Sequence, residues 1–292
     1  MLIEPVGPVI VGVDGSSESM LAVDFAADEA MGRVTPLVVV HAVGGPEAAR
    51  PVDTLAPVST PRLSEGRRLT AVAVARAEAE HPGLAVSAEL IWGEAASALA
   101  ARSRRASLLV VGHGRRGTDP KLVLERLMRQ ASVPVMVHRS FEISPLAPQP
   151  RPVLVGVQSG PGAESVIQFA FDEAYLRGAP LLAVHVWARP SNSGSAESGS
   201  DWFALNDARY EARRMLADAL ARWSDKYPGV QVYRVVRHAL DVPVALTAAS
   251  RAAQLAVVGV TRWERLHGSV AGSVSAVLLH RAGCPVAVIP HD

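Results

Sequence analysis

The chain has 292 residues, a length that corresponds to about two domains of ~150 residues each. Hydrophobic residues make up 49% of the sequence and charged residues 20%, a balance typical of a folded globular protein and not of a disordered one. The formal net charge of +1 argues against a nucleic acid as the main partner, because binding to a polyanion requires a basic face.

The first half of the chain alternates short apolar runs with helical patterns. The runs are rich in Val and almost continuously apolar, which is typical of strands buried on both faces of a sheet. They fall at 9–13, 37–41, 85–91, 107–111 and 133–137. Helical stretches lie between them, near 17–31, 62–80, 94–104 and 121–131. Such alternation predicts a parallel sheet with right-handed crossovers.

The same pattern returns in the second half of the chain. The segment 9–14 (Val-Ile-Val-Gly-Val-Asp) recurs as 153–158 (Val-Leu-Val-Gly-Val-Gln), displaced by 144 residues. The second set of strands is expected at 153–157, 181–186, 230–236, 254–258 and 285–289. A repeat this long and collinear indicates a duplicated domain. We therefore predict an α/β protein of two tandem, doubly wound, five-stranded parallel-sheet domains, 1–140 and 153–292, with a proline-rich linker at 141–152.

Cysteine content and hydropathy bear on location. The single cysteine, Cys284, excludes a disulfide within the chain. No apolar stretch approaches the ~20 residues that a membrane-spanning helix needs. The first eight residues lack the basic and apolar regions of a secretory signal. We expect a cytoplasmic protein with no membrane partner.

Two turns lie where ligands bind in an open parallel sheet, beyond the carboxyl ends of its strands. The first strand of the first copy leads into Asp14-Gly15-Ser16-Ser17. The fourth strand of the second copy leads into Gly259-Val260-Thr261-Arg262, nine further residues, and then Gly272-Ser273-Val274-Ser275. Glycines let the backbone approach an anion closely, and the start of a helix offers free N–H groups to phosphate. The alternative role for Ser273 is a simple helix N-cap.

These turns resemble the universal stress protein family. The family has a first strand ending Val-Gly-Val-Asp-Gly-Ser and a fourth-strand turn reading Gly-x2-Gly-x9-Gly-Ser/Thr. The resemblance covers nearly the whole chain, is particularly to tandem two-domain bacterial members, and implies the adenine nucleotide alpha hydrolase-like fold in both halves. It also implies ATP or a related adenine nucleotide as ligand, with the turn on the phosphates and ribose and the Asp on the nucleoside side. Mg²⁺ is expected only together with ATP.

The second copy departs from the family pattern at two positions. Arg262 replaces the second glycine of the turn, and Gln158 replaces the first-strand Asp. This copy therefore keeps most of the phosphate cradle and lacks the acid. Its expected nucleotide contacts are Gly259, Arg262, Gly272, Ser273, Ser275 and Gln158.

The first copy departs in the opposite way. Asp14 and Gly112 are retained as candidate contacts, but the loop after Gly112 is four residues shorter, so that Lys121 and Leu122 take the places of the Gly-Ser pair. This copy keeps the acid and lacks the cradle. If only one copy binds nucleotide, we expect it to be the second.

Other chemistry has weaker support in the sequence. Gly112-x-Gly114-x-x-Gly117 matches the dinucleotide fingerprint, but it follows the fourth strand and not the first. His41 and His185 end equivalent strands, and because neither has a second ligand at metal-binding spacing, a structural role is favoured over metal binding. No catalytic constellation is evident from the spacing of the side chains.

The sequence thus supports a non-enzymatic stress-response regulator that binds an adenine nucleotide through degenerate sites. We also expect a homodimer and protein partners of unknown identity. The alternative is a scaffold that has lost nucleotide binding and acts through protein contacts. An enzyme acting on a small phosphorylated substrate is a third, disfavoured hypothesis.

Overall fold

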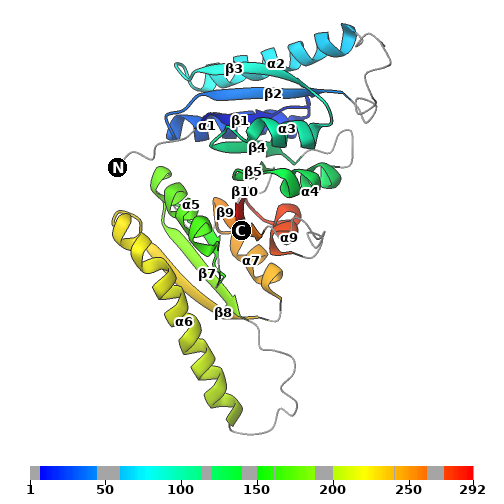
Figure 1. The fold of residues 1–292 in the computed structure, drawn as a ribbon. Helices are drawn as coiled ribbons and strands as arrows, with labels where there is room; N and C mark the ends of the chain where they lie inside the picture. The colour runs from blue at the N-terminus through cyan, green and yellow to red at the C-terminus, as the bar shows by residue number, and fades with distance from the viewer. Residues whose placement is uncertain are drawn as a thin grey trace. The chain divides into compact units, whose positions relative to one another are not determined.

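The structure, a computed structural model, describes residues 7–44, 60–113, 120–139, 150–158, 160, 162–187, 200–239, 241–261 and 273–291. The described residues form two compact units, called here unit 1 (7–139) and unit 2 (150–291). Each unit is a parallel β-sheet covered by helices (Figure 1). Most of the expected linker, residues 141–149, lies outside the described residues.

Unit 1 has five strands and four helices among its described residues. They are β1 (Val9–Gly12), α1 (Ser17–Gly32), β2 (Leu37–Val43), α2 (Thr60–Glu80), β3 (Val86–Trp92), α3 (Ala95–Ser103), β4 (Leu108–Gly112), α4 (Pro120–Gln130) and β5 (Val135–His138). The strands are parallel, in the order β3-β2-β1-β4-β5. Because β1 lies between β2 and β4, the chain winds outward from the centre in both directions.

Unit 2 repeats this arrangement. Its elements are β6 (Val153–Gly156), α5 (Ala163–Leu176), β7 (Leu181–Trp187), α6 (Ser200–Lys226), β8 (Val232–His238), α7 (Val242–Ser250), β9 (Leu255–Thr261), α9 (Val274–Arg281) and β10 (Val286–His291). Its strands are also parallel, in the order β8-β7-β6-β9-β10. The predicted fold of two doubly wound five-stranded parallel sheets is confirmed.

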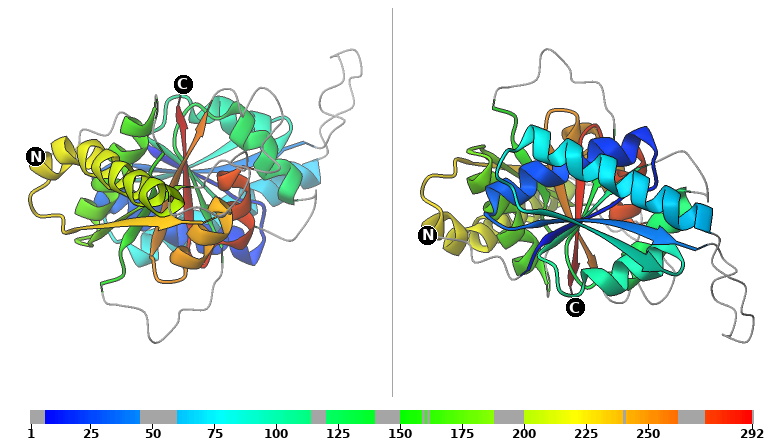
Figure 2. Two further views of the ribbon diagram at one scale, coloured as in Figure 1. Left: turned by 90° about the horizontal axis from the view of Figure 1, so that it is seen from below. Right: turned by 90° about the horizontal axis from the view of Figure 1, so that it is seen from above.

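Helices cover both faces of each sheet, as the two views of Figure 2 show. In unit 1, α1 packs with α2 on one face and α3 with α4 on the other; in unit 2 the pairs are α5 with α6 and α7 with α9. The central strands are therefore buried on both faces, and Val9, Ile10 and Val11 are fully inaccessible to solvent. This double burial explains why the strands are nearly continuous apolar runs in the sequence.

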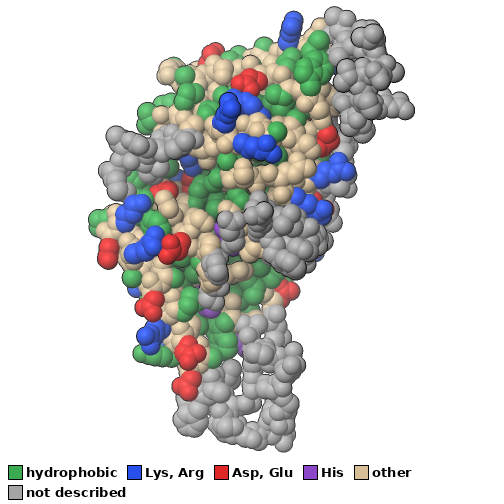
Figure 3. Space-filling view, in the orientation of Figure 1, with side chains coloured by type: hydrophobic (Ala, Val, Ile, Leu, Met, Phe, Trp, Pro, Cys, Tyr) green, Lys and Arg blue, Asp and Glu red, His purple; other side chains and the backbone are tan. Residues whose placement is uncertain are grey.

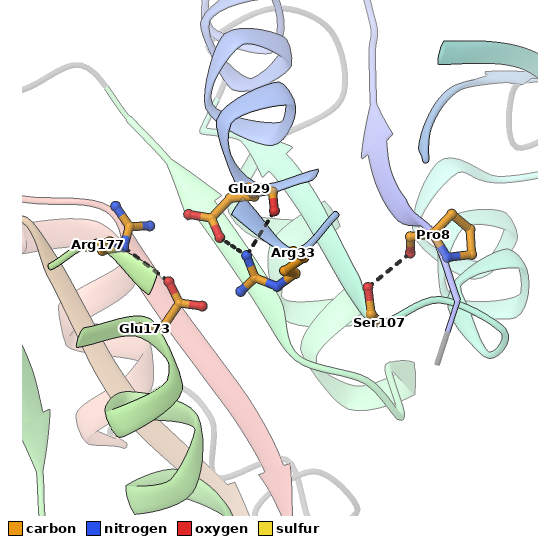
Figure 4. Close-up of polar contacts among 6 residues, drawn as sticks. All are labelled: Pro8, Glu29, Arg33, Ser107, Glu173 and Arg177. Atoms are coloured by element: carbon orange, nitrogen blue, oxygen red, sulfur yellow. Dashed lines mark hydrogen bonds and ion pairs between the residues drawn. The ribbon is translucent and has the colours of Figure 1, made fainter. Parts of the chain in front are cut away.

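The first helix of each unit ends in the same ion pair (Figure 4). In unit 1, Arg33 Nη1 donates to the carboxylate of Glu29 and, at 3.2 Å, to its carbonyl oxygen. In unit 2, Arg177 Nε lies 3.0 Å from Glu173 Oε2. Both carboxylates are buried, with 5% of Glu29 and 1% of Glu173 exposed. Burying an unpaired carboxylate costs several kcal/mol, so each of these carboxylates needs a cationic partner. The arginine at the end of each helix provides that positive charge.

On the solvent side, the face drawn in Figure 3 shows Lys and Arg side chains interspersed with Asp and Glu. Such mixing is consistent with the nearly neutral net charge of +1. None of the helices in the described part of the chain has the length and apolar character needed to cross a membrane.

Four strands of unit 2 end later than their sequence pattern predicts, among them β9 and β10. β9 continues to Thr261, although the apolar run ends at 258, and β10 continues to His291. The two strands stay paired through these last residues, with Ile289 opposite Gly259 and His291 opposite Thr261. The extension brings both polar side chains to the carboxyl edge of the sheet.

Candidate functional site

A cavity of about 460 Å³ opens at the carboxyl edge of the unit 2 sheet. It lies where the chain order reverses, because β6 pairs with β7 on one side and with β9 on the other. Doubly wound sheets bind their ligands at this switch point, and small-molecule sites are typically ~300–1,000 Å³ in volume. The residues that line the cavity come from four strands and three helices: Gly156, Val157, Gln158, Gly160, Ala163, Val166, Ile167, Val184, His185, Val186, Val242, Leu246, Val258, Gly259, Thr261, Val274 and His291.

In the described part of the chain, the wall of the cavity is apolar apart from four polar side chains. These are Gln158, His185, Thr261 and His291, and among the described lining residues none is Asp, Glu, Lys or Arg. Glycine backbone completes the wall, at Gly156 on β6 and Gly259 on β9 among other positions. A wall of this kind recognises a flat or apolar group by contact and fixes it with a few neutral hydrogen bonds.

Beside the cavity, α5 starts later in the repeat than the first helix of unit 1 does. In the register of the repeat, α1 begins at Ser17 and its counterpart would begin at 161, but α5 begins at Ala163. Its N-cap is Gly162, in the left-handed conformation with φ +84, and no side chain caps the helix. The first backbone N–H groups of α5 are therefore not satisfied by a side-chain cap, and the space beside the end of β9 is not filled by a helical turn.

The equivalent turn in unit 1 is closed on itself. Asp14 Oδ1 accepts hydrogen bonds from the Ser16 N–H at 2.9 Å and from the Ser16 hydroxyl at 2.5 Å. Ser16 in turn caps α1, its Oγ accepting from the Ser19 N–H at 3.1 Å. The carboxylate that the family pattern places on the nucleoside side thus stabilises its own turn.

In unit 1, the first turn of α1 packs against the end of β4. A Cβ on Gly112 would lie 2.5 Å from the carbonyl oxygen of Glu18 and 2.8 Å from the Ser19 nitrogen, so the first turn of α1 lies directly on this glycine. In unit 2 a Cβ on Gly259 would instead meet the side chains of His291, at 2.6 Å, and Val166, at 3.0 Å. The glycine at the end of the fourth strand thus contacts helix backbone in unit 1, whereas in unit 2 it contacts side chains.

Two histidines lie at this end of the unit 1 sheet. The His113 N–H donates to the His138 carbonyl oxygen at 2.8 Å, and the His138 ring packs on Phe25 with 5.4 Å between ring centroids. Burial lowers the pKa of both imidazoles below the usual 6.5, and the neighbouring Arg139 lowers that of His113 further. The buried Nδ1 of His138 has no hydrogen-bond partner in the described part of the chain. Both rings are therefore suited to the neutral state.

Unit 1 has a hollow of a different kind, of about 560 Å³, on the α2 side of its sheet. It is lined by Asp14, His41, Ala42, Val43, Gly44, Pro61, Arg62, Glu65 and Leu69. Here charged side chains predominate among the polar ones. Arg68 binds the Glu65 carboxylate through two nitrogens, at 2.8 and 2.7 Å, and holds the pKa of that carboxyl below its usual value. The two copies thus present different chemistry at the ends of equivalent strands.

His41 and His185 make the same contact in the two units. His41 Nδ1 lies 2.7 Å from the carbonyl oxygen of Val13, and His185 Nδ1 lies 2.9 Å from that of Val157. Each imidazole thereby ties the second strand of its unit to the residue that follows the first strand. The structural role favoured from the sequence is present in both copies, and His185 in addition lines the unit 2 cavity.

The predicted site residues are not all at the cavity. Gly259 and Gln158 line it. Ser273 is the N-cap of α9, its Oγ accepting from the Ala276 N–H at 3.3 Å and lying 2.9 Å from Ser275 Oγ. Ser275 is buried, and neither serine is among the lining residues. Arg262 and Gly272 lie outside the described residues, as do the side chains of Lys121 and Leu122.

Sequence reasoning missed His291 at the cavity. The residue follows the apolar run of β10, which by itself indicates only the end of a strand. The signal that was available is register: a strand parallel to β9 delivers the residues at its carboxyl end to the same edge as Gly259 and Thr261. Any polar residue just beyond the last strand of such a sheet is therefore a candidate for this site.

Comparison with known proteins decides the family. The model of the universal stress protein family matches the chain twice, over residues 6–139 and 150–290. This chain belongs to the universal stress protein family. Its two universal stress domains follow one another along the chain, and curated universal stress proteins match it over almost its whole length.

Two such relatives come from Mycobacterium tuberculosis H37Rv. Universal stress protein Rv2005c is 38% identical over 296 residues, covering 96% of both chains. Universal stress protein Rv2623 is 35% identical over 291 residues, covering 96% of this chain and 95% of the relative. A crystal structure of a universal stress protein from Archaeoglobus fulgidus DSM 4304 matches 100% of this chain and 98% of its own with a TM-score of 0.68 at 15% identity, which shows the shared fold.

Proposed function

We propose that this universal stress protein binds an adenine nucleotide in the unit 2 cavity and acts as a regulatory binding protein, not as an enzyme. One observation carries the proposal: a cavity of about 460 Å³ lies at the switch point and is bounded by Gly259, the first glycine of the family's phosphate turn. The family resemblance suggests ATP or a related adenine nucleotide as the ligand.

The residues at the cavity suit the parts of a nucleotide. Val186, Leu246 and Val258 offer apolar contact to a purine ring, and Gln158 offers a neutral hydrogen-bonding group in place of the acid found in the family pattern. Gly259 permits close approach of the backbone, and α9 starts at the cavity with Val274, so that a phosphate placed there meets the start of a helix. Because the described wall contains no carboxylate, Mg²⁺ would be held by the phosphates of ATP.

Equilibrium titration with ATP, ADP and AMP tests the proposal, and mass spectrometry of the purified protein for nucleotide tests it independently. We expect one nucleotide per chain. Val186→Trp should fill the unit 2 cavity and abolish binding, since this half-buried side chain lines it. Ala42→Trp, the equivalent change in unit 1, serves as the matched control because Ala42 lines the other hollow, and it should leave binding unchanged.

Other results would favour a different function. No binding of any adenine nucleotide to the natural chain would favour the scaffold that acts through protein contacts. Two nucleotides per chain, or binding lost in Ala42→Trp alone, would place a site in unit 1 and contradict the proposal.

We further propose that the protein acts in the cytoplasm during stress, as a homodimer. The family membership supports the role in stress. Light scattering of the purified chain tests the dimer, and cell fractionation tests the location. Comparison of a deletion strain with its parent under several stresses tests the role.

A further inference from the structure

The imidazole of His185 has one nitrogen bonded to the backbone and a second nitrogen that can bond a ligand. Its Nδ1 lies 2.9 Å from the Val157 carbonyl oxygen. A carbonyl oxygen can only accept, so Nδ1 must carry the proton of this hydrogen bond. In a neutral imidazole the other nitrogen, Nε2, is then an acceptor. The backbone of β6 thereby fixes the tautomer of a side chain that belongs to β7.

The second nitrogen is available at the cavity. His185 is half-buried and lines the cavity, and in the described part of the chain its only hydrogen bond is the one at Nδ1. The ring is not fully buried, so Nε2 is open to the cavity that the residue lines. A fixed, accessible acceptor on an otherwise largely apolar wall favours a ligand that brings a donor to it, because burying the acceptor unpaired is costly.

We propose that His185 is a specificity-determining residue of the unit 2 site, and that its Nε2 accepts a hydrogen bond from an N–H or O–H group of the bound nucleotide. This inference rests on the proposed function and adds the group that selects the ligand. A nucleotide has two sources of such a donor, the exocyclic amine of adenine and the ribose hydroxyls. A site built to bond a donor rejects an analogue that lacks it, since the protein acceptor is then left unpaired.

Substitution of His185 by asparagine and by glutamine distinguishes the roles of the two ring nitrogens. His185→Asn places an amide where Nδ1 was, so it can still donate to Val157, but it removes the acceptor at the Nε2 position. His185→Gln places an amide near the Nε2 position and loses the donor to Val157. A residue with only a structural role would be harmed more by the glutamine, whereas a ligand acceptor would be harmed more by the asparagine.

The experiment is titration of both variants with AMP, with purine riboside 5′-monophosphate, which lacks the amine, and with 2′-deoxy-AMP and 3′-deoxy-AMP. We expect His185→Asn to weaken AMP binding about 3- to 10-fold, the value of one hydrogen bond, and His185→Gln to weaken it less. For the analogue that lacks the bonded donor, natural chain and His185→Asn should bind equally. The analogue for which the two proteins bind equally shows whether the amine, the 2′-hydroxyl or the 3′-hydroxyl donates to His185.

His41→Asn is the matched control, because His41 makes the same contact to Val13 in unit 1. It should leave the affinity for every ligand unchanged. Equal loss for AMP and for all three analogues in His185→Asn would overturn the inference, and so would unchanged affinity for AMP. If the natural chain bound no nucleotide at all, the proposed function itself would fail; the inference alone fails only when the natural chain binds and the variants do not discriminate.

Discussion

The imidazole of His291 lies against the backbone of Gly162, and a Cβ added to Gly162 would overlap its Nδ1. The same ring borders Gly259, so one side chain from the end of β10 lies between the start of α5 and the end of β9. This packing ties three elements together at the unit 2 cavity. In this position the ring leaves no room for a Cβ on either glycine, and at Gly162 the left-handed backbone with φ +84 independently favours glycine.

Gly162→Ala should therefore destabilise unit 2 by more than the conformational strain alone. Strain of a non-glycine residue at positive φ costs about 1 kcal/mol, and displacement of the His291 ring adds to it. The matched control is Gly178→Ala, which has φ +56 and nothing within 4 Å of the added Cβ. Denaturant unfolding should show a loss about 1 kcal/mol or more greater for Gly162→Ala. Equal losses would show that the ring moves away without cost.

Arg177→Ala should lower the free energy of unfolding strongly. The change leaves the Glu173 carboxylate, which is 1% exposed, without its partner at 3.0 Å. Removal of one partner from a buried ion pair typically costs about 3–5 kcal/mol, and because Arg177 is itself partly exposed we expect the lower end of that range. Arg68→Ala breaks the exposed pair with Glu65, and because water screens that pair the free energy of unfolding should change little. A similar loss in the two variants would contradict the prediction.

Lower pH should destabilise unit 1 through His138. Burial lowers the pKa of this imidazole in the folded protein, while in the unfolded chain it stays near the usual 6.5. The unfolded state therefore binds more protons below that value, and the stability that the neutral ring contributes is present above pH ~6.5 and is lost as the pH falls further. His138→Ile, which copies Ile289 from unit 2, should flatten this loss.

Thermal unfolding at pH 7.5, 6.5 and 5.5 measures the effect. The melting temperature of the natural chain should fall more between the last two pH values than that of His138→Ile. His113, whose pKa is also lowered by burial, remains in the variant, so part of the pH dependence should persist. An identical pH dependence in both proteins would exclude His138 as its source.

Ser273→Ala should cost about 1 kcal/mol of stability through loss of the cap of α9. Ser273→Asn should restore it, because asparagine is an equally good N-cap. If the hydroxyl serves mainly as a cap, the two variants should bind ATP alike after correction for stability. A large loss of ATP affinity in both variants, with stability intact in Ser273→Asn, would instead support the phosphate contact expected from the sequence.

Arg262→Ala tests the substitution that distinguishes this turn from the family pattern. Arg262 lies outside the described residues, so the prediction rests on its charge. A guanidinium binds phosphate with two parallel hydrogen bonds, so its loss should weaken ATP more than AMP. Titration of Arg262→Ala and Arg262→Gly with both nucleotides measures this. Tighter ATP binding in both variants would show that the arginine obstructs the turn.

The strands could be predicted from the sequence because burial on two faces leaves few polar residues in them. The parallel, doubly wound class followed from the alternation of these strands with helices. The late start of α5 could not be predicted from the sequence. Gly160 and Gly162 permit several turn conformations, and only packing in the folded protein selects one of them. The bond from Ser16 to Asp14 was recognisable in principle, because Asp-x-Ser is also the pattern of a turn closed by its own side chain. His291 required the register of two strands that are adjacent only in space.

The central position of β1 has a consequence for synthesis of the chain. Val9 pairs with Leu37 on one side but with Leu108 on the other, about 100 residues later. Ribosomes add ~5–20 residues per second, so the second edge of β1 waits roughly 5–20 s for its neighbour. During that interval an apolar strand is exposed to other nascent chains. A newly made first copy is therefore expected to expose this strand edge until β4 is synthesised, and the same wait then recurs for β6 and β9.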